Sequence, residues 1–317
     1  MALHLIAALG LLFSATFAET KELALQIHLD RAGFSCSTID GVWGRKAERA
    51  LMLYLQERRK ASPELPERFA SPRAAYDALF ADAPDPFRIE TVSEADIAAL
   101  VKIPESPSEK ATLGRMGYET IREMFAERGH LSQIALSKMN PGVDWNAVRP
   151  GLKLVIPDFP PISEEFKAAD RGRPSRPRRP EAALVRVSLS QCEIRAYDAD
   201  GRIVGLFPCS IAADKAKVPA SGELHVTSYV AWPNFTYTPD YTPRGQKVSR
   251  YIWPPGENCP VGVAWMGLNL PGYGIHGTPR PESIGFTGSH GCFRLANWNA
   301  ARLYAMCRPG VRVVIEP

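Results

Sequence analysis

The pattern of apolar and polar residues predicts a helical N-terminal half. Between Lys21 and Lys60 two helical stretches are predicted on either side of "GFSCSTIDGVWG": Leu23, Leu25, Ile27 and Leu29 precede Gly33, and apolar residues recur at three- and four-residue spacing from Ala47 to Leu55. Asp40-Gly41 and Gly44 mark tight turns between them. Further helices are predicted over residues 72–80, 93–101, 120–128 and 132–139.

From Leu184 onward the period changes to two. The run "ALVRVSLSQCEIRAYDADGRIVGLFPCSIAAD" alternates apolar and polar residues on both sides of Asp200-Gly201, which predicts a β-hairpin. Three more strands are predicted at 222–230, 261–268 and 311–315, with one helix at 297–307. We therefore expect a multidomain chain in which a mostly-β domain follows smaller helical units.

The chain begins with an almost wholly apolar stretch, "MALHLIAALGLLFSATFA", in which the small residues Thr16 and Ala18 precede polar "ETKE". This pattern predicts a secretory signal peptide, residues 1–18, and export to the periplasm or cell envelope. Because the stretch contains no Lys or Arg, an uncleaved anchor stays as the alternative. The apolar run is too short to span a bilayer comfortably, so we expect no stable membrane insertion after cleavage.

The charge balance is mild, with 38 Lys and Arg against 34 Asp and Glu and a formal net charge of +4. No basic patch interleaves with aromatic residues, so we expect no nucleic-acid partner. The run "RGRPSRPRRP" at 171–180 combines like charges with proline, which favours an extended, exposed segment. We assign residues 159–181 as a linker.

Two N-terminal stretches resemble modules that bind cell-wall polymers. "LQIHLDRAGFSCSTIDGVWGRKAERALMLYLQ" is similar to the small helical peptidoglycan-binding module, which places that module at 20–60. The alternative is a helical hairpin without a ligand.

A second stretch, "YETIREMFAERGHLSQIALSKMNPGVDWNAVRPGLKLVIPDF", resembles a LysM module at 110–158, chiefly in its "NP…PGLKLVIP" ending. The resemblance implies binding to glycan chains, and the alternative is a structural spacer. Residues 61–109, rich in Pro, Ala and acidic residues, are assigned as a connector.

The segment "GSHGCFRL" at 288–295 carries the candidate chemistry. A nucleophilic cysteine needs a nearby base and backbone donors for an oxyanion, and Cys292 has His276 and His290 as candidate bases. Gly291 permits a turn that a Cβ would obstruct, and Arg294 is expected to favour the thiolate. Two alternatives stay open, a buried inert cysteine and a zinc site built from both histidines and the cysteine.

The stretch "YGIHGTPRPESIGFTGSHGCFRL" resembles the signature of the L,D-transpeptidase (YkuD-type) catalytic domain. The resemblance extends to "VPASGELHVTSYV" and "PPGENCPVGVAWMGL" and covers residues 182–317, for which it implies a sandwich- or barrel-like β fold with one or two helices. The implied site has seven members: Cys292 as nucleophile, His276 as general base, the Gly277 carbonyl as its orienting partner, Ser289 and His290 in the catalytic loop, backbone N–H groups around Gly291, and Arg294 as support. Cys259 replaces an asparagine of the family pattern and adds a second thiol beside the cleft.

The resemblance implies acyl transfer from a peptidoglycan tetrapeptide stem to an amine acceptor, with release of D-alanine and with neither a metal nor another cofactor. Expected partners are stem peptides and glycan chains, and we expect a monomer. Three alternatives keep the same fold: an L,D-carboxypeptidase, a lipoprotein-anchoring enzyme and a non-catalytic wall-binding protein.

Six cysteines in an exported chain make disulfides possible. A four-residue loop at 199–202 would pair Asp198 with Ile203 and set Cys192 directly opposite Cys209. This register predicts a Cys192–Cys209 disulfide, with two small buried hydrophobic residues as the alternative. A loop that is one residue longer or shorter would turn one cysteine to the other face.

Overall fold

The computed structural model describes residues 20–169, 180–219, 222–239, 249–286, 288 and 291–317. The expected signal peptide and nearly all of the Pro/Arg-rich run lie outside these residues. Across the described ranges, no helix has both the length and the apolar character needed to cross a membrane.

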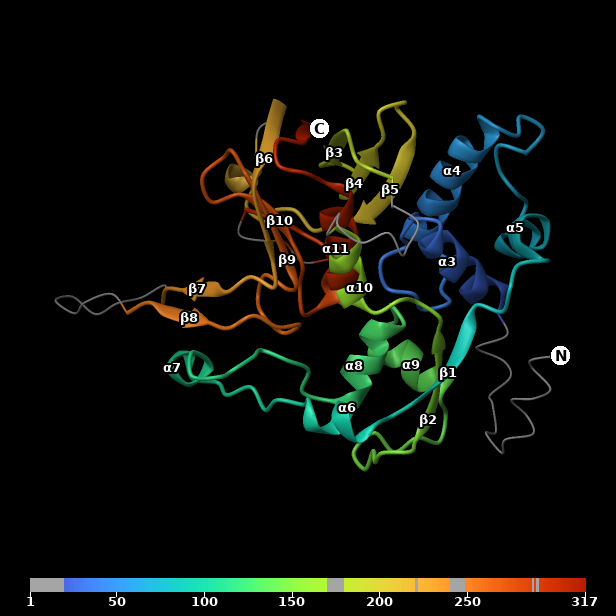
Figure 1. The fold of residues 1–317 in the computed structure, drawn as a ribbon. Coiled ribbons are helices and arrows are strands. Elements are labelled where there is room, and N and C mark those ends of the chain that lie inside the picture. Colours follow the sequence, from blue (N-terminus) through green and yellow to red (C-terminus); the bar gives the residue numbers. More distant parts are fainter. Residues whose placement is uncertain (1–19, 170–179, 220–221, 240–248, 287, 289–290) are drawn as a thin grey trace.

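The C-terminal part is built on one eight-stranded sheet, with strand order β11-β10-β9-β6-β12-β3-β4-β5. Figure 1 shows most of these strands beside α11. Two neighbouring pairs, β10 with β11 and β12 with β3, are parallel, and the other pairs are antiparallel. The strands are β3 (Leu184–Ser188), β4 (Glu193–Tyr197), β5 (Ile203–Pro208), β6 (Gly222–Ala231), β9 (Ala264–Leu268), β10 (Gly274–His276), β11 (Phe293–Arg294) and β12 (Arg312–Glu316). The predicted mostly-β domain is confirmed.

One long helix, α11 (Asn297–Met306), packs on the sheet and is almost wholly buried. Two short 3₁₀ helices, η1 (Lys215–Lys217) and η2 (Pro281–Ser283), lie in loops beside the sheet. A separate hairpin of β7 (Phe235–Tyr237) and β8 (Tyr251–Trp253) extends away from the sheet (Figure 1). Its strands lie between the predicted ones and are too short to show a clear period.

The hairpin register agrees with the prediction at the cysteines, but not at the turn, where Ile203 pairs with Tyr197 instead of Asp198 because of a bulge at Ala196/Tyr197, and the disulfide does not form. Glu193 pairs with Pro208, and the backbone N–H of Cys209 donates to the carbonyl of Cys192 at 2.8 Å. Nevertheless all six cysteines are free thiols, so the predicted Cys192–Cys209 bond is wrong. Cys192 has a left-handed backbone (φ 51°), and its thiol lies 3.5 Å from the carbonyl of Leu189. This conformation takes its Cβ out of the direction that a regular strand would give it.

The first unit contains α3 (Lys21–Arg31), α4 (Arg45–Arg59) and α5 (Pro72–Phe80), which agrees with the predicted helices. The hydroxyl of Thr20 caps α3 and that of Ser71 caps α5, because each accepts a backbone N–H of the first turn. The loop after α3 also protects the edge of the sheet. The N–H of Leu206 in β5 donates to Gly33, and the N–H of Ser35 donates back to Leu206.

The second unit begins earlier than predicted. Strand β1 (Phe87–Thr91) lies in the expected connector and pairs antiparallel with β2 (Lys153–Pro157). Between these strands lie α6 (Glu94–Ala98), α7 (Pro107–Lys110), α8 (Ile121–Arg128) and α9 (Gln133–Met139). The two-stranded sheet and the pair α8–α9 share one apolar core, so this unit starts near residue 87 rather than at 110.

The first part of the expected linker 159–181 is helical and packed. It contains α10 (Ile162–Ala169), which lies beside α11 (Figure 1). Phe166 packs edge-to-face on Tyr304 of α11, with ring centroids 5.3 Å apart. Ile162 and Phe166, four residues apart, both pack against the core of the catalytic part. The composition of the segment does not show this spacing.

A buried ion cluster joins the three units at α11. Arg302 of α11 donates to the carboxylate and carbonyl oxygens of Asp30 at the end of α3, and Nδ1 of His130 lies 3.0 Å from the same carboxylate. The three residues are at most 3% exposed. Burial alone would raise the pKa of Asp30, but the charges of Arg302 and His130 outweigh it and hold that pKa well below its usual range.

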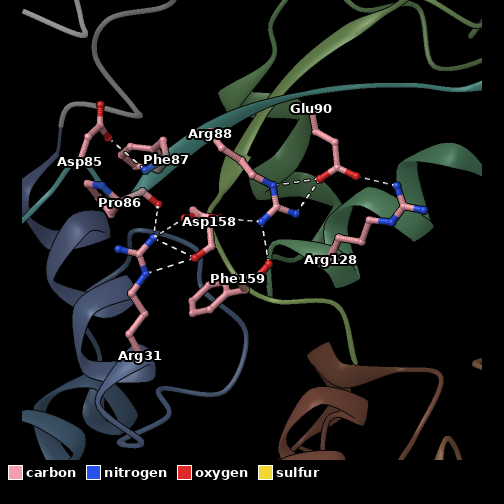
Figure 2. Close-up of polar contacts among 9 residues, drawn as sticks. All are labelled: Arg31, Asp85, Pro86, Phe87, Arg88, Glu90, Arg128, Asp158 and Phe159. Carbon is pink, nitrogen blue, oxygen red and sulfur yellow. Dashed lines mark hydrogen bonds and ion pairs between the residues drawn. The ribbon is translucent and has the colours of Figure 1, made fainter. Parts of the chain in front are cut away.

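A second, more exposed network joins the first two units (Figure 2). Arg31 of α3 donates to the carbonyls of Pro86 and Asp158. Arg88 of β1 binds both Asp158 and Glu90, and Glu90 also binds Arg128 of α8. These contacts fix the helical unit against the end of the β1–β2 sheet at which β1 begins and β2 ends.

Replacing Arg302 tests the buried cluster. Arg302→Met leaves the Asp30 carboxylate buried without its main cation, so we expect the free energy of unfolding in urea to fall by roughly 3–5 kcal/mol. The double variant Asp30→Asn/Arg302→Met should recover part of this loss. Arg312→Met, which removes an exposed pair with Glu223, is the control and should leave the free energy of unfolding near wild type. Equal effects of the Arg302 and Arg312 changes would contradict the role of the cluster.

Candidate active site

The parallel pair β10–β11 brings the two principal candidates together. Ile275 pairs with Phe293 and His276 with Arg294, which sets Cys292, one position earlier, beside Gly274. Since side chains alternate between the faces of a sheet, Cys292, His276 and Arg294 project from the same face. A hydrogen bond from the N–H of Leu295 to the carbonyl of His276, 2.8 Å long, closes the ladder behind them.

The thiol of Cys292 is held by the backbone just before β10. Its Sγ lies 3.5 Å from the carbonyl oxygen of Gly272, to which the S–H donates. Burial raises the pKa of the Cys292 thiol above its ordinary value, and a hydrogen bond from the backbone of Gly274 only partly opposes this. A thiol that donates to one backbone group and accepts from another is in its protonated form.

The imidazole of His276 is oriented by the next residue in the chain. Its Nδ1 lies 2.7 Å from the carbonyl oxygen of Gly277, the contact that the resemblance implied. Because a carbonyl can only accept, Nδ1 carries the proton and Nε2 is left as the basic nitrogen. The ring of Trp265 stacks on the imidazole with centroids 5.6 Å apart. Sequence reasoning missed Trp265, although its alternation within β9 puts it on this face.

The resting pair of Cys292 and His276 is therefore electrically neutral. Burial is the main reason that the pKa of His276 is lowered to about 4; the hydrogen bond to Gly277 opposes this shift and the charge of Arg294 adds to it. With the thiol pKa raised as well, a neutral thiol faces a neutral imidazole near pH 7. The expectation that Arg294 favours the thiolate is not met, because its charge acts on the histidine and its guanidinium binds elsewhere.

Arg294 instead supports the catalytic loop. Its Nη2 donates to the carbonyl of Gly288 at 2.9 Å, while its backbone pairs with Ser210. A Cβ on Gly288 would lie 2.2 Å from that of Ala213, so only glycine allows this close approach. Gly291 has a positive φ of 152°, which agrees with the turn expected before the cysteine. The candidates Ser289 and His290 lie outside the described residues.

Tyr273 is a second residue that sequence reasoning missed. A Cβ on Gly291 would lie 3.4 Å from its ring, and its hydroxyl donates to the carbonyl of Lys217 at 3.0 Å. Its position in "YGIHG", three residues before His276, was the available signal. Tyr273 therefore connects the turn before the cysteine to the segment at η1.

Cys259, the second thiol expected beside the cleft, is a buried residue. It is completely buried, its thiol lies 3.5 Å from the carbonyl of Pro233, and burial raises its pKa to about 11. Within the described ranges, no three or more His, Cys, Asp or Glu side chains are grouped as metal ligands would be.

A family model of the L,D-transpeptidase catalytic domain (YkuD) matches residues 182–315. The expected histidine and cysteine both fall inside this match. Residues 182–315 form an L,D-transpeptidase catalytic domain. The prediction of this catalytic domain in the C-terminal part of the chain is therefore confirmed.

Among known proteins, the chain is 29% identical over 203 residues to a Bacillus licheniformis protein named as L,D-transpeptidase YkuD, covering 63% of this chain and 94% of that one. It is 34% identical over 121 residues to a Fuscovulum blasticum protein also named as an L,D-transpeptidase, covering 37% of this chain and 60% of that one.

Among solved structures, an L,D-transpeptidase from Mycobacterium smegmatis matches 42% of this chain and 58% of its own, at 17% identity and a TM-score of 0.33. The Enterococcus faecium catalytic domain acylated by ertapenem matches 43% of this chain and 97% of its own, at 21% identity and a TM-score of 0.33.

The neutral resting pair of the L,D-transpeptidase domain has a measurable consequence. We expect the rate constant for alkylation of Cys292 by iodoacetamide to rise about tenfold per pH unit through neutrality, with no plateau below pH 9, because it follows the thiolate fraction. Peptide mapping assigns the label to Cys292. His225→Ala, which removes an exposed histidine of β6, should give the same pH profile as wild type. A plateau between pH 5 and 8 would instead reveal a thiolate–imidazolium pair.

Proposed function

We propose that this protein is a peptidoglycan L,D-transpeptidase that transfers an acyl group from a tetrapeptide stem to an amine. The observation that carries the proposal is the placement of Cys292 and an Nδ1-anchored His276 on one face of β10–β11, inside the matched catalytic domain. The neutral thiol and the basic Nε2 suit a proton transfer that accompanies attack on the substrate.

In the first half-reaction, the thiol sulfur of Cys292 attacks the carbonyl of the third stem residue as its proton passes to Nε2 of His276. The bond to the terminal D-alanine breaks, and the imidazolium gives that proton to the departing amine. In the second half-reaction, an acceptor amine loses a proton to His276 and attacks the thioester, which restores the thiol. Backbone N–H groups around Gly291 and Cys292 would stabilise the oxyanion of both steps.

The surroundings of the site suit an anionic stem peptide. Burial lowers the pKa of Arg294 and the charge of Arg280 lowers it further, so two positive charges stand close together in the matched domain. Stem peptides end in carboxylates, which such a rim attracts and orients. Water as acceptor would make the same site an L,D-carboxypeptidase, and a lipoprotein lysine would make it an anchoring enzyme.

For the N-terminal units we propose that they hold the enzyme on the cell wall, which requires export across the inner membrane. Support comes from the stretches that resemble wall-binding modules and from their fold, a helical unit and a unit in which β1 and β2 flank α8 and α9. The alignment with the Bacillus licheniformis protein spans 203 residues and therefore reaches upstream of residue 182. Binding to the polymer would raise the effective substrate concentration at the catalytic domain.

Cys292→Ala separates catalysis from wall binding. We expect this variant to form no new cross-links in purified sacculi and no adduct with ertapenem, because the attacking sulfur is gone, while it still sediments with the sacculi. Muropeptide analysis checks the first outcome and intact-protein mass spectrometry the second. Cys192→Ala, at the half-buried thiol of the hairpin, is the control and should retain both activities.

In the same assay with wild-type protein, new stem dimers support transpeptidation. Tripeptides without dimers would contradict transpeptidation and indicate carboxypeptidase activity. Unchanged muropeptides would contradict both activities and indicate a protein that only binds the wall. Turnover by Cys292→Ala would remove Cys292 as the nucleophile.

A further inference from the structure

Asn297, the first residue of α11, is completely buried where the second N-terminal unit meets the catalytic domain. Its amide Nδ2 donates to both carboxyl oxygens of Glu127 in α8, at 3.3 and 3.2 Å, and to the backbone carbonyl of Glu257 at 3.1 Å. Its amide is therefore held from one side by a residue of another unit.

The other end of the same amide faces the catalytic strands. Oδ1 of Asn297 accepts the N–H of Val263 at 3.3 Å. It also lies so close to two glycines that an added Cβ would be 2.3 Å away at Gly277 and 2.1 Å away at Gly262. The amide oxygen of Asn297 is therefore packed directly against the backbone of Gly277.

Gly277 in turn orients the catalytic base. Its N–H donates to Ala264 at 3.2 Å, and its carbonyl accepts Nδ1–H of His276 at 2.7 Å. This last bond fixes the tautomer in which Nε2 is the base. A continuous set of contacts thus runs from Glu127 through Asn297 and Gly277 to His276.

We propose that Glu127, in the second N-terminal unit, is a positioning residue for His276 and acts by holding the amide of Asn297 against Gly277. The unit then has a part in catalysis besides wall binding, since it completes the support of the base. The inference rests on the proposed function, in which His276 takes the thiol proton.

The surroundings of Glu127 define which substitutions are informative. The hydroxyl of Tyr118 donates to its Oε1 at 3.0 Å, and both residues line a cavity of about 580 Å³ together with Glu257 and Arg115. Burial raises the pKa of Glu127 to about 8, with the charge of Glu257 adding to the shift. The carboxyl is therefore mostly protonated near neutrality, so a glutamine offers Asn297 an equivalent acceptor oxygen.

Four variants of the full-length protein test the proposal. Glu127→Leu removes the acceptor of the Asn297 amide. Glu127→Asp keeps a carboxyl group but shortens the side chain by one methylene, so that the group no longer reaches Asn297. The aspartate variant tests the proposal even if the leucine variant does not fold. Glu127→Gln is the conservative replacement. Tyr118→Phe is the matched control, because it removes the other donor to Glu127 and leaves Asn297 in contact.

Two measurements need no peptidoglycan. The ¹⁵N shifts of His276 report its tautomer, and ertapenem acylation reports the rate at Cys292. We expect Glu127→Leu and Glu127→Asp to mix the His276 tautomers and to slow acylation on the order of tenfold, as the loss of one buried hydrogen bond would do. Glu127→Gln and Tyr118→Phe should retain the wild-type tautomer and rate.

A double-mutant cycle shows whether the effect passes through Asn297. Asn297→Leu should slow acylation at least as much as Glu127→Leu, and the double variant should be no slower than Asn297→Leu. Additive losses, or folded Glu127→Leu and Glu127→Asp variants with the wild-type His276 spectrum, would overturn the proposal. If wild type fails to react with ertapenem, the proposed function is at fault, and the ¹⁵N spectra still decide the role of Glu127.

Discussion

The whole arrangement depends on the charge buried beneath α11, where Arg302, Asp30 and His130 meet. A charge in the protein interior costs several kcal/mol unless it is paired, so neither Arg302 nor Asp30 can be buried alone. His130 is further enclosed between the rings of Phe159 and Trp298. Because the partners come from three units, separating the units would expose or isolate a charge. The chain is therefore not a row of tethered modules.

The same helix serves the catalytic site. Its buried face presents Asn297 to α8, Asn299 to the loop after α3, and Arg302 to the end of α3. On its N-terminal side, α11 follows β11 after only two residues, and β11 itself directly follows Cys292. One stretch of chain thus joins the nucleophile to the contacts that hold the N-terminal units. This continuity gives those units a physical connection to the base that a flexible linker would not provide.

Burial also determines how the site can react. It raises the pKa of Cys292 and lowers that of His276, so both effects oppose an ion pair in the resting protein. In the mechanism that we propose, the sulfur becomes nucleophilic only as its proton moves to Nε2, which ties activation to the presence of substrate. The single buried imidazole bond to Gly277 takes on a correspondingly large role, because it selects the nitrogen that receives the proton.

The sequence by itself determined the elements with strong periodicity and the chemistry with a sharp motif: the paired N-terminal helices, the hairpin register at Cys192, and the pair His276 and Cys292. It could not determine β1, because a five-residue strand in a polar segment becomes visible only when β2 pairs with it. The free thiols of Cys192 and Cys209 depended on one left-handed backbone conformation, which no residue pattern specifies. The direction of the Cys292 pKa shift and the contact of Glu127 with Asn297 were decided by tertiary structure alone, because desolvation and contacts between distant segments arise only when the units pack together.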